Sequence, residues 1–319
     1  MEGTASDWVQ VISGVPQGSV LGPTLFVAAV HSIPEDIRSS VKIYADDTKL
    51  YRPLRSQSDV QALQKDIDTL VEWTERWQLP LNTAKCKVMH MGASNQDFDY
   101  MMAGQKLEVT AEERDLGLLV DRSLLFHGHA AATVAKAFRT LGIIRRTFLD
   151  LNEVTLPLLL KAMVRPILEY GNSVWGPVFC GDQDKVERVL RRATKMVKAL
   201  KHLPYQERLK QLRMPSMCYR RERGDMIMVH QLLTNKIRID PTSFFALAPE
   251  NVITRGHSRK LLKPAANKVI RQRFFSHRII NSWNSLPDEV VSADSTNSFK
   301  NRLDKYWKDR MFKTRDESQ

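Results

Sequence analysis

Two adjacent carboxylates, Asp46 and Asp47, stand at the centre of the stretch VKIYADDTKLY, residues 41–51. The β-branched and aromatic residues on each side predict a β-hairpin with the acidic pair at its turn. Neighbouring carboxylates on a tight turn repel each other unless a positive charge lies beside them. A divalent metal such as Mg²⁺ could supply it, because Mg²⁺ binds carboxylate oxygens together with the phosphate oxygens of a substrate. A solvated turn is the alternative, since Asp is common in turns for its own backbone hydrogen bonds.

The segment upstream, SGVPQGSVLGP, is dense in Gly and Pro. A turn made by Pro16, Gln17 and Gly18 at a helix entrance offers backbone N–H groups, an amide side chain and a surface without Cβ. A flat base or sugar could approach such a turn closely. Apolar residues at helical spacing then predict a helix that begins near Pro23 and ends before Pro34. A plain loop leading into a helix is the alternative.

The elements after the acidic turn read as scaffold. Residues 58–77 predict an amphipathic helix with a capping box from Ser58 to Gln61. Alternating patterns predict short strands around residues 85–91, 106–109 and 116–120.

Charge divides the chain into an acidic and a basic part. The formal net charge is +12 over 319 residues. Residues 1–130 contain 12 Lys/Arg and 18 Asp/Glu, a balance of −6, and residues 131–319 contain 36 and 18, a balance of +18. The asymmetry suggests metal chemistry in the first part and contact with a polyanion in the second.

Composition narrows the class of protein. Hydrophobic content of 43% and charged content of 26% are typical of a globular chain, and its length allows two or three subdomains. No apolar run is long enough to cross a bilayer, and the first residues do not resemble a secretory signal. The three cysteines, Cys86, Cys180 and Cys218, suit neither a disulfide framework nor a zinc pair. We therefore expect a reducing location, in the nucleus and cytoplasm.

The basic half is expected to be largely helical, with helices from about residue 126, over 154–170 and over 185–202. Pro166 would kink the second of these or lie where a neighbouring helix covers the gap. In the third, apolar residues form one stripe and cations occupy the rest of the circumference. The foremost cations are Arg188, Arg191, Arg192, Lys195 and Lys198. A solvated face on a packed helix, an anionic membrane surface and phosphate contact are all compatible with this pattern.

The last part of the chain begins with a segment rich in Pro, Asn and Arg over residues 241–267, which we interpret as an irregular linker. Residues 271–287 interleave aromatic side chains with cations. Such a stretch can stack nucleic-acid bases, but burial of its Phe and Trp in a small core is the favoured interpretation. A final helix is expected over 298–312. His127, His129, His257 and His277 have no metal-like spacing with each other or with cysteine, so no zinc site is assigned to them.

Taken together, four motifs resemble consecutive motifs of the reverse transcriptases of non-LTR retrotransposons, of the LINE-type, jockey-like group. They are SGVPQGSVLGP at 13–23, YADD at 44–47, LN…KC…M…G between 81 and 92, and LG…D between 116 and 121. Their order and spacing match those of the family, and the downstream chain resembles the C-terminal region of the same group. The resemblance therefore covers nearly the whole sequence.

The resemblance implies roles for particular residues. Asp46 matches the carboxylate that holds the catalytic Mg²⁺ ions, for which Mn²⁺ can substitute, and Asp47 matches its acidic supporting neighbour. Tyr44 matches the residue next to the primer end and the nucleotide site. Lys85 matches a lysine near the nucleotide phosphates that is proposed to donate a proton to departing pyrophosphate.

The family's pattern also places two other segments beside the substrates. Pro16, Gln17 and Gly18 match the turn that packs beside the incoming deoxynucleotide and the template base. The residues that match the hairpin supporting the primer strand are Leu116, Gly117 and Asp121. In the family, two metal ions position the 3′-hydroxyl of a DNA primer for attack on the α-phosphate of the nucleotide.

The chain departs from the family in one serious respect. The family's palm carries another aspartate on a strand upstream of the Pro-Gln-Gly loop, and both metal ions depend on it. Only thirteen residues precede Gly14, and their one aspartate, Asp7, lies at the lead-in to the loop. The fingers and an endonuclease domain have no counterpart either. Because too few oxygens would converge on Mg²⁺, we expect this chain alone not to polymerise.

The sequence therefore predicts an α+β protein, an incomplete polymerase palm with an antiparallel sheet and packed helices, followed by a mostly helical thumb and C-terminal region. The expected domains are a partial palm (1–125), a helical thumb-like domain that grips the template–primer duplex (126–240), and a linker with a small helical C-terminal region (241–319). The expected partners are an RNA template, a DNA primer and deoxynucleoside triphosphates, and not a membrane. Given the resemblance, phosphate contact with an RNA or hybrid duplex is the favoured role of Arg188, Arg191, Arg192, Lys195 and Lys198. Two alternatives are a non-catalytic nucleic-acid-binding remnant of a transposable element and a degenerate chain without a stable fold.

Overall fold

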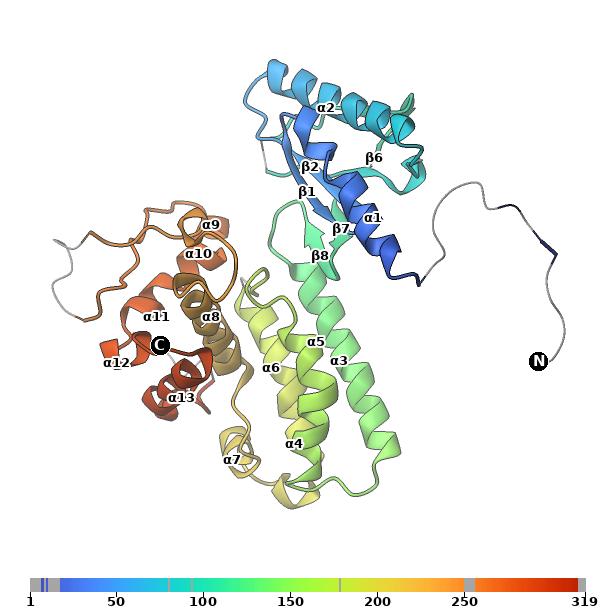
Figure 1. Ribbon diagram of the computed structural model, residues 1–319. Coiled ribbons are helices and arrows are strands. Elements are labelled where there is room, and N and C mark those ends of the chain that lie inside the picture. The colour runs from blue at the N-terminus through green and yellow to red at the C-terminus, as the bar shows by residue number, and fades with distance from the viewer. Residues whose placement is uncertain are drawn as a thin grey trace. The chain divides into compact units, whose positions relative to one another are not determined.

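The computed structural model divides the chain into two compact units, Met1–Ala111 and Glu112–Gln319 (Figure 1). The structure describes residues 7–8, 10, 18–79, 81–92, 94–177, 179–249 and 256–314. Helices and four small two-stranded sheets occur together, so the α+β class expected from the sequence is confirmed. None of the described helices combines the length and apolarity that a membrane span requires.

The first unit is organised around a hairpin and one long helix. After α1 (Leu21–Val30) and a 3₁₀ turn (Ile33–Asp36), β1 (Ser40–Tyr44) pairs antiparallel with β2 (Asp47–Tyr51). Helix α2 (Gln57–Arg76) supplies buried Leu70 and Trp73 against half-buried residues of the hairpin, Val41, Ile43 and Leu50. The predicted hairpin and both predicted helices are therefore present.

The start of α2 differs from the prediction. Ser56, not Ser58, is the N-cap, and the carboxylate that completes the capping box belongs to Asp59. The Ser56 N–H donates to Asp59 Oδ2 at 3.2 Å, and the Arg55 N–H donates to the same oxygen at 3.0 Å. A Ser-x-x-acid pair and a Ser-x-x-Gln pair overlap in this sequence, and the carboxylate accepts the stronger, charge-assisted hydrogen bonds.

The remaining strands of the first unit are short. After a 3₁₀ turn (Thr83–Lys85), β3 (Lys87–Val88) pairs parallel with β6 (Glu108–Val109), and β4 (Met101–Met102) pairs antiparallel with β5 (Gln105–Lys106). The strand expected over 85–91 is thus limited to two residues. The Gln64 side chain of α2 exchanges two hydrogen bonds with the backbone of Met101, at 2.8 and 2.9 Å, so the helix holds this region in place.

The second unit begins with a hairpin and continues as packed helices. Strands β7 (Glu112–Asp115) and β8 (Leu118–Asp121) are joined by Leu116 and Gly117, both at positive φ (45° and 83°), as a two-residue hairpin turn requires. The helices that follow are α3 (His127–Thr147), α4 (Thr155–Leu159), α5 (Arg165–Glu169), α6 (Cys180–Thr194) and α7 (Tyr205–Gln211). Their inward faces form one continuous core.

Pro166 shapes the helix that contains it. Helices α4 and α5 are joined by a π turn over Leu160–Val164, in which the Arg165 N–H donates to the Leu160 carbonyl. Pro166 has no N–H to continue an α-helical ladder, and a wider turn accommodates it without ending the helix. The predicted distortion is therefore located one turn before the proline.

The C-terminal part of this unit packs around α8 (Met217–Leu233). After a largely irregular stretch come α9 (Val269–Arg273), α10 (Phe275–Arg278), α11 (Ile280–Asn284), α12 (Asp288–Val291) and α13 (Thr296–Tyr306). Trp283, Phe299 and Leu303 are fully buried among them. The preferred interpretation of the aromatic residues as core is confirmed for Phe275 and Trp283 and is wrong for Phe274, which is exposed.

Candidate active-site hairpin and nucleic-acid interface

The acidic pair lies at the tip of the β1–β2 hairpin. Tyr44 pairs with Asp47 across the strands, which leaves Ala45 and Asp46 as a two-residue turn. Ala45 has a φ of 52°, a conformation that residues with a Cβ rarely adopt. Both carboxylates are exposed, so the turn presents them to solvent.

The two faces of the hairpin differ in chemistry. Val41 and Leu50 pair across the strands and face the apolar core. Tyr44, which is 66% exposed, shares the opposite face with Asp47, because side chains alternate along a strand. The outward face thus carries an aromatic ring next to one of the two carboxylates.

The base of the hairpin is held by a buried carboxylate that the sequence did not identify. Asp66 of α2 accepts hydrogen bonds from the backbone N–H of Arg38 at 3.1 Å and of Ser39 at 2.8 Å, just before β1 begins. On the other side, Arg52 follows β2 and pairs with Asp59 at 3.2 Å. The sequence feature that could have identified Asp66 is its position beside Ile67, on the inward side of an amphipathic helix. The tip is therefore mounted on a rigid element rather than on a free loop.

Replacing Asp66 with alanine should destabilise the first unit by at least about 1–3 kcal/mol, because buried backbone N–H groups lose their acceptor. Urea unfolding of the full chain measures this, and hydrogen exchange should show faster opening at residues 38–44. Asp68→Ala, which removes an exposed carboxylate from the same helix, is the control. Equal stability of the two variants would show that Asp66 does not anchor the hairpin.

The described residues do not complete a metal site around the acidic pair. Within the described part of the chain, no group of three or more His, Cys, Asp or Glu side chains converges on one point. Mg²⁺ needs near-octahedral oxygen coordination, and two neighbouring carboxylates supply only part of it. The donor set present here fits a contribution to a shared site and not a self-sufficient one.

Gly18 and Lys85, two further predicted substrate-binding or catalytic residues, are both exposed. Pro16 and Gln17 lie outside the described residues, and Gly18 is exposed with a φ of 85°. Lys85 is exposed at the end of its 3₁₀ turn, and it forms no ion pair with either carboxylate of the YADD turn, both of which the structure describes. The geometry thus does not join Lys85 to the acidic pair.

The third predicted segment belongs to the second unit. Leu116 forms the turn with Gly117, and its carbonyl accepts a hydrogen bond from the Tyr170 hydroxyl at 2.7 Å. Asp121 accepts hydrogen bonds from the backbone of Ser123 and Phe126, at 3.0 and 2.6 Å, at the entrance of α3. Burial alone would raise the pKa of Asp121, but the hydrogen bonds it accepts lower the pKa overall. Asp121 therefore has a structural role in joining β8 to α3.

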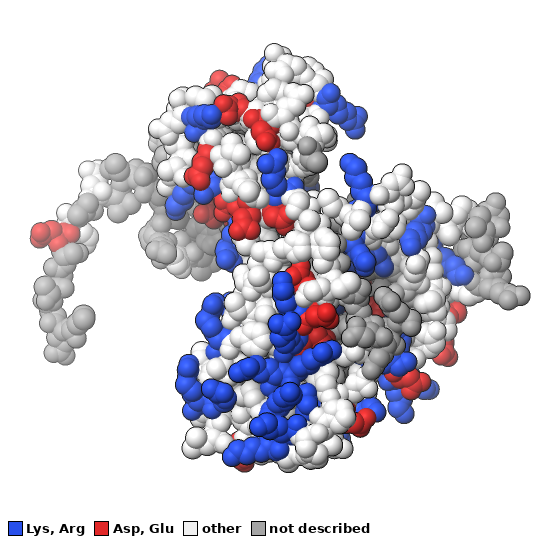
Figure 2. Space-filling view, turned by 180° about the vertical axis from the view of Figure 1, so that it is seen from behind, with Lys and Arg blue, Asp and Glu red and all other residues white. Residues whose placement is uncertain are grey.

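A basic surface covers part of the second unit, and Figure 2 shows Lys and Arg side chains gathered on one of its faces. The predicted cations are all exposed, and the apolar stripe that accompanies them is buried. The exposed set is Arg188, Arg191, Arg192, Lys195 and Lys198, and the buried set is Val186, Val189, Leu190, Ala193, Val197 and Leu200. The helix is shorter than predicted, because α6 ends at Thr194 and only a 3₁₀ turn (Lys198–Leu200) follows.

The early end of α6 has a long-range cause. The Arg208 guanidinium of α7 is buried, and it donates to Thr194 Oγ1 at 3.0 Å and to the Arg191 carbonyl at 3.4 Å. These contacts satisfy groups at the C-terminal end of the helix. Lys195 and Lys198 consequently project from the segment after the helix.

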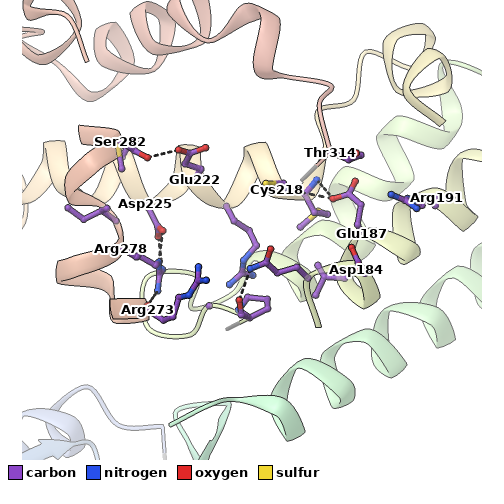
Figure 3. Close-up of a pocket in the computed structure, with 18 residues that line it drawn as sticks. Asp184, Glu187, Arg191, Cys218, Glu222, Asp225, Arg273, Arg278, Ser282 and Thr314 are labelled. Carbon is purple, nitrogen blue, oxygen red and sulfur yellow. Dashed lines mark hydrogen bonds and ion pairs between the residues drawn. The ribbon is translucent and has the colours of Figure 1, made fainter. Parts of the chain in front are cut away.

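A cavity of about 260 Å³ lies between α6, α8 and α10 in the second unit (Figure 3). Three of its carboxylates already have partners. Asp225 accepts from Arg278 Nε and Nη2, each at 2.9 Å, and Glu222 accepts from Ser282 Oγ at 2.7 Å. Glu187 accepts from the Tyr205 hydroxyl and from the Met217 N–H at the start of α8.

The electrostatics of the cavity indicate a structural role. Burial raises the pKa of Glu187 and of Asp225, although the hydrogen bonds and cations beside each act in the opposite direction. Burial also lowers the pKa of Arg221 to about 10, while its guanidinium lies 4.1 Å from the centre of the Trp175 ring. These hydrogen bonds and ion pairs around the cavity hold α6, α8 and α10 together. Because all three carboxylates already have partners, none of them is available as a general base.

The chain is similar to one protein family and to several known proteins. Residues 1–144 match the family model described as "Reverse transcriptase (RNA-dependent DNA polymerase)". The chain is 28% identical over 211 residues to the RNA-directed DNA polymerase from mobile element jockey of Drosophila melanogaster, an alignment that covers 61% of this chain and 22% of the relative. Its counterpart from Drosophila funebris is 29% identical over 229 residues, covering 66% of this chain and 24% of the relative.

A third relative is the probable RNA-directed DNA polymerase from transposon BS of Drosophila melanogaster, 27% identical over 211 residues, covering 60% of this chain and 23% of the relative. No solved structure shows a significant match. The chain spans about a quarter of the length of these curated relatives. The resemblance to jockey-like non-LTR retrotransposons is confirmed, because residues 1–144 match the reverse transcriptase model and the relatives are polymerases from such mobile elements.

Proposed function

We propose that this chain is the C-terminal part of an RNA-directed DNA polymerase of a non-LTR retrotransposon, comprising the remainder of the palm, the thumb and the C-terminal region. The observation that carries the proposal is the Tyr44-Ala45-Asp46-Asp47 hairpin, whose exposed carboxylates project from a tip supported by α2. In a longer parent these carboxylates would contribute oxygens to a divalent-metal site completed by groups outside the described residues. The substrates proposed for that parent are an RNA template, a DNA primer and deoxynucleoside triphosphates.

The remaining site assignments form part of the same proposal. Tyr44 would contact the primer end, and Pro16, Gln17 and Gly18 would lie beside the incoming nucleotide and the template base. Lys85 would lie near the nucleotide phosphates. Neutral substitution of Lys85 should reduce extension less than neutral substitution of Asp46, because Asp46 would bind the metal ion directly.

Primer extension tests the proposal. A longer parent that includes this chain should incorporate deoxynucleotides on an RNA template annealed to a DNA primer, with Mg²⁺ or Mn²⁺ present. The 319-residue chain alone should not, because two carboxylates do not satisfy Mg²⁺. Failure of every longer parent to extend, with folding and primer binding intact, would contradict the proposal.

The second candidate function is non-catalytic binding of nucleic acid by the second unit. The observation that favours it is the exposed set of cations on and just after α6, which lies over a fully buried apolar stripe. A rigid basic face of this kind contacts phosphates and reads little sequence. This function would not depend on Asp46.

Replacing Arg188 and Arg192 together with glutamine should weaken binding to an RNA–DNA hybrid duplex and reduce the slope of log K against log salt by about 1–2, since two phosphate contacts are lost. Fluorescence anisotropy at several salt concentrations measures this. Lys65→Gln, an exposed cation on α2 in the first unit, is the control and should leave the slope unchanged. An unchanged slope in the double variant would place the duplex elsewhere.

A further inference from the structure

One segment of the second unit has a charge pattern that the proposed function does not use. Residues 256–287 contain seven Lys/Arg and no Asp/Glu. They form α9, α10, α11 and the irregular stretch before them. A stretch of this length with cations and no carboxylate is complementary to a polyanion.

Some of these cations are engaged within the fold and others are not. Arg278 pairs with Asp225, and Lys263 Nζ donates to Asn281 Oδ1 at 3.1 Å. Four cations are exposed and form no ion pair with any described residue: Arg259, Lys268, Arg271 and Arg273. These four have no carboxylate partner among the described residues, although Arg271 Nη1 lies 3.5 Å from Ser276 Oγ.

The adjacent phenylalanines at the junction of α9 and α10 have opposite environments. Phe275 is 4% exposed and belongs to the core around α8, whereas Phe274 is 44% exposed. The backbone of Phe274 is extended (φ −62°, ψ 145°) between the two short helices, so its ring projects outward. The Arg271 guanidinium lies 5.7 Å from the centre of that ring.

The segment that carries Phe274 is held in place from several directions. Gln272 Nε2 donates to the Ala266 carbonyl at 2.9 Å, and His277 Nε2 lies 3.1 Å from the Pro264 carbonyl. Arg278 Nη1 donates to the Arg273 carbonyl at 3.3 Å, while its other nitrogens bind Asp225. Binding here would require little additional ordering of the chain.

We propose that this surface binds single-stranded nucleic acid, with one base stacked on the Phe274 ring and the flanking phosphates on Lys268, Arg271 and Arg273. An exposed aromatic ring among unpaired cations is the arrangement that binds single strands without strong sequence preference. A duplex offers no unstacked base to such a ring. The surface differs from the basic face of α6, which is proposed to contact duplex phosphates, in its exposed aromatic ring, although Arg273 and Arg191 line the same cavity.

An anionic membrane is the competing ligand for a surface that mixes exposed Val269 and Ile270 with cations. The geometry favours nucleic acid for two reasons. Helix α9 has five residues, too few for a helix that lies in a membrane interface with a continuous apolar face. The Arg271 guanidinium also lies beside the Phe274 ring, so insertion of this ring among acyl chains would draw a charge out of water, which is costly.

The test measures binding of the full chain to a fluorescently labelled single-stranded oligonucleotide by anisotropy. Phe274→Ala should weaken binding about 5- to 150-fold, the range expected for loss of one stacked base. Phe274→Trp should retain affinity and add an indole emission that single-stranded oligonucleotide quenches. Val269→Ala, which removes a similarly exposed apolar side chain from α9 that cannot stack, is the matched control and should bind normally.

Three results would overturn the proposal. Phe274→Ala could bind the single strand as tightly as the parent chain, which would exclude stacking. It could weaken hybrid-duplex and single-strand binding equally, which would indicate a general change of the surface. It could reduce binding to vesicles of anionic lipid while leaving single-strand binding intact, which would assign the surface to a membrane. The proposal rests on nucleic acid as the ligand of the second unit. The α6 variants test duplex binding and the Phe274 variants test single-strand binding, so each of the two proposals can fail while the other holds.

Discussion

Asp46→Asn in a longer parent polymerase should lower primer extension on RNA by about 10³-fold or more. The substitution keeps the size of the side chain and removes its charge, so the oxygen that remains is a poor ligand for a divalent cation. Metal assistance is worth several kcal/mol of transition-state stabilisation, and each 1.36 kcal/mol corresponds to a factor of ten in rate. Steady-state incorporation of a single deoxynucleotide measures the effect.

The comparison needs a variant that loses an equivalent charge elsewhere. Glu75→Gln removes an exposed carboxylate from α2 in the same unit, and it should leave extension unchanged. Binding of the primer–template should be similar in both variants, because the phosphate contacts proposed for the duplex lie in the second unit. An Asp46→Asn parent that extends primers as fast as the Glu75→Gln parent would refute the assignment of the hairpin.

Asp225→Ala should destabilise the second unit by about 3–5 kcal/mol. The substitution removes the carboxylate that accepts two hydrogen bonds from Arg278, and it takes a negative charge away from the half-buried Arg221. Removing one member of a buried ion pair typically has a cost of this size, because the remaining charge is desolvated and uncompensated. Urea unfolding followed by the fluorescence of the buried Trp175, Trp283 and Trp307 reports on this unit.

Two further variants distinguish loss of the Asp225–Arg278 ion pair from a general loss of stability. Asp184→Ala removes an exposed carboxylate at the rim of the same cavity and should change stability by less than about 0.5 kcal/mol. Asp225→Leu combined with Arg278→Met replaces both partners with apolar groups and should be less destabilised than Asp225→Ala. If Asp225→Ala unfolds at the same urea concentration as Asp184→Ala, the Asp225–Arg278 pair does not hold the helices together.

Local patterns in the sequence were sufficient for the hairpin and for most helices. Strand residues 41–44 and 47–51 alternate around a two-residue turn, and the structure has the hairpin there. Pro166 predicted a distortion of its helix, and the structure has a π turn just before it. In each case the physical cause lies within a few residues of the feature, so the sequence alone carries the information.

Features set by distant partners could not be predicted in this way. In α8, Arg220 binds Glu169, 51 residues away, and Arg223 binds Asp304, 81 residues away. Arg208 likewise contributes to the end of α6 from the next helix. The candidate site shows the same division, because the acidic turn was visible in the sequence whereas Asp66, which anchors its base, was not.

The most direct measurement of the central claim is a Mn²⁺ titration followed by paramagnetic broadening of the amide signals of residues 44–48, on this chain and on a longer parent. The proposal predicts weak, incomplete broadening in this chain and saturable broadening at much lower Mn²⁺ in the parent, lost on Asp46→Asn. Equal Mn²⁺ affinity in the parent and its Asp46→Asn variant would contradict the claim that the hairpin tip holds the metal of a polymerase.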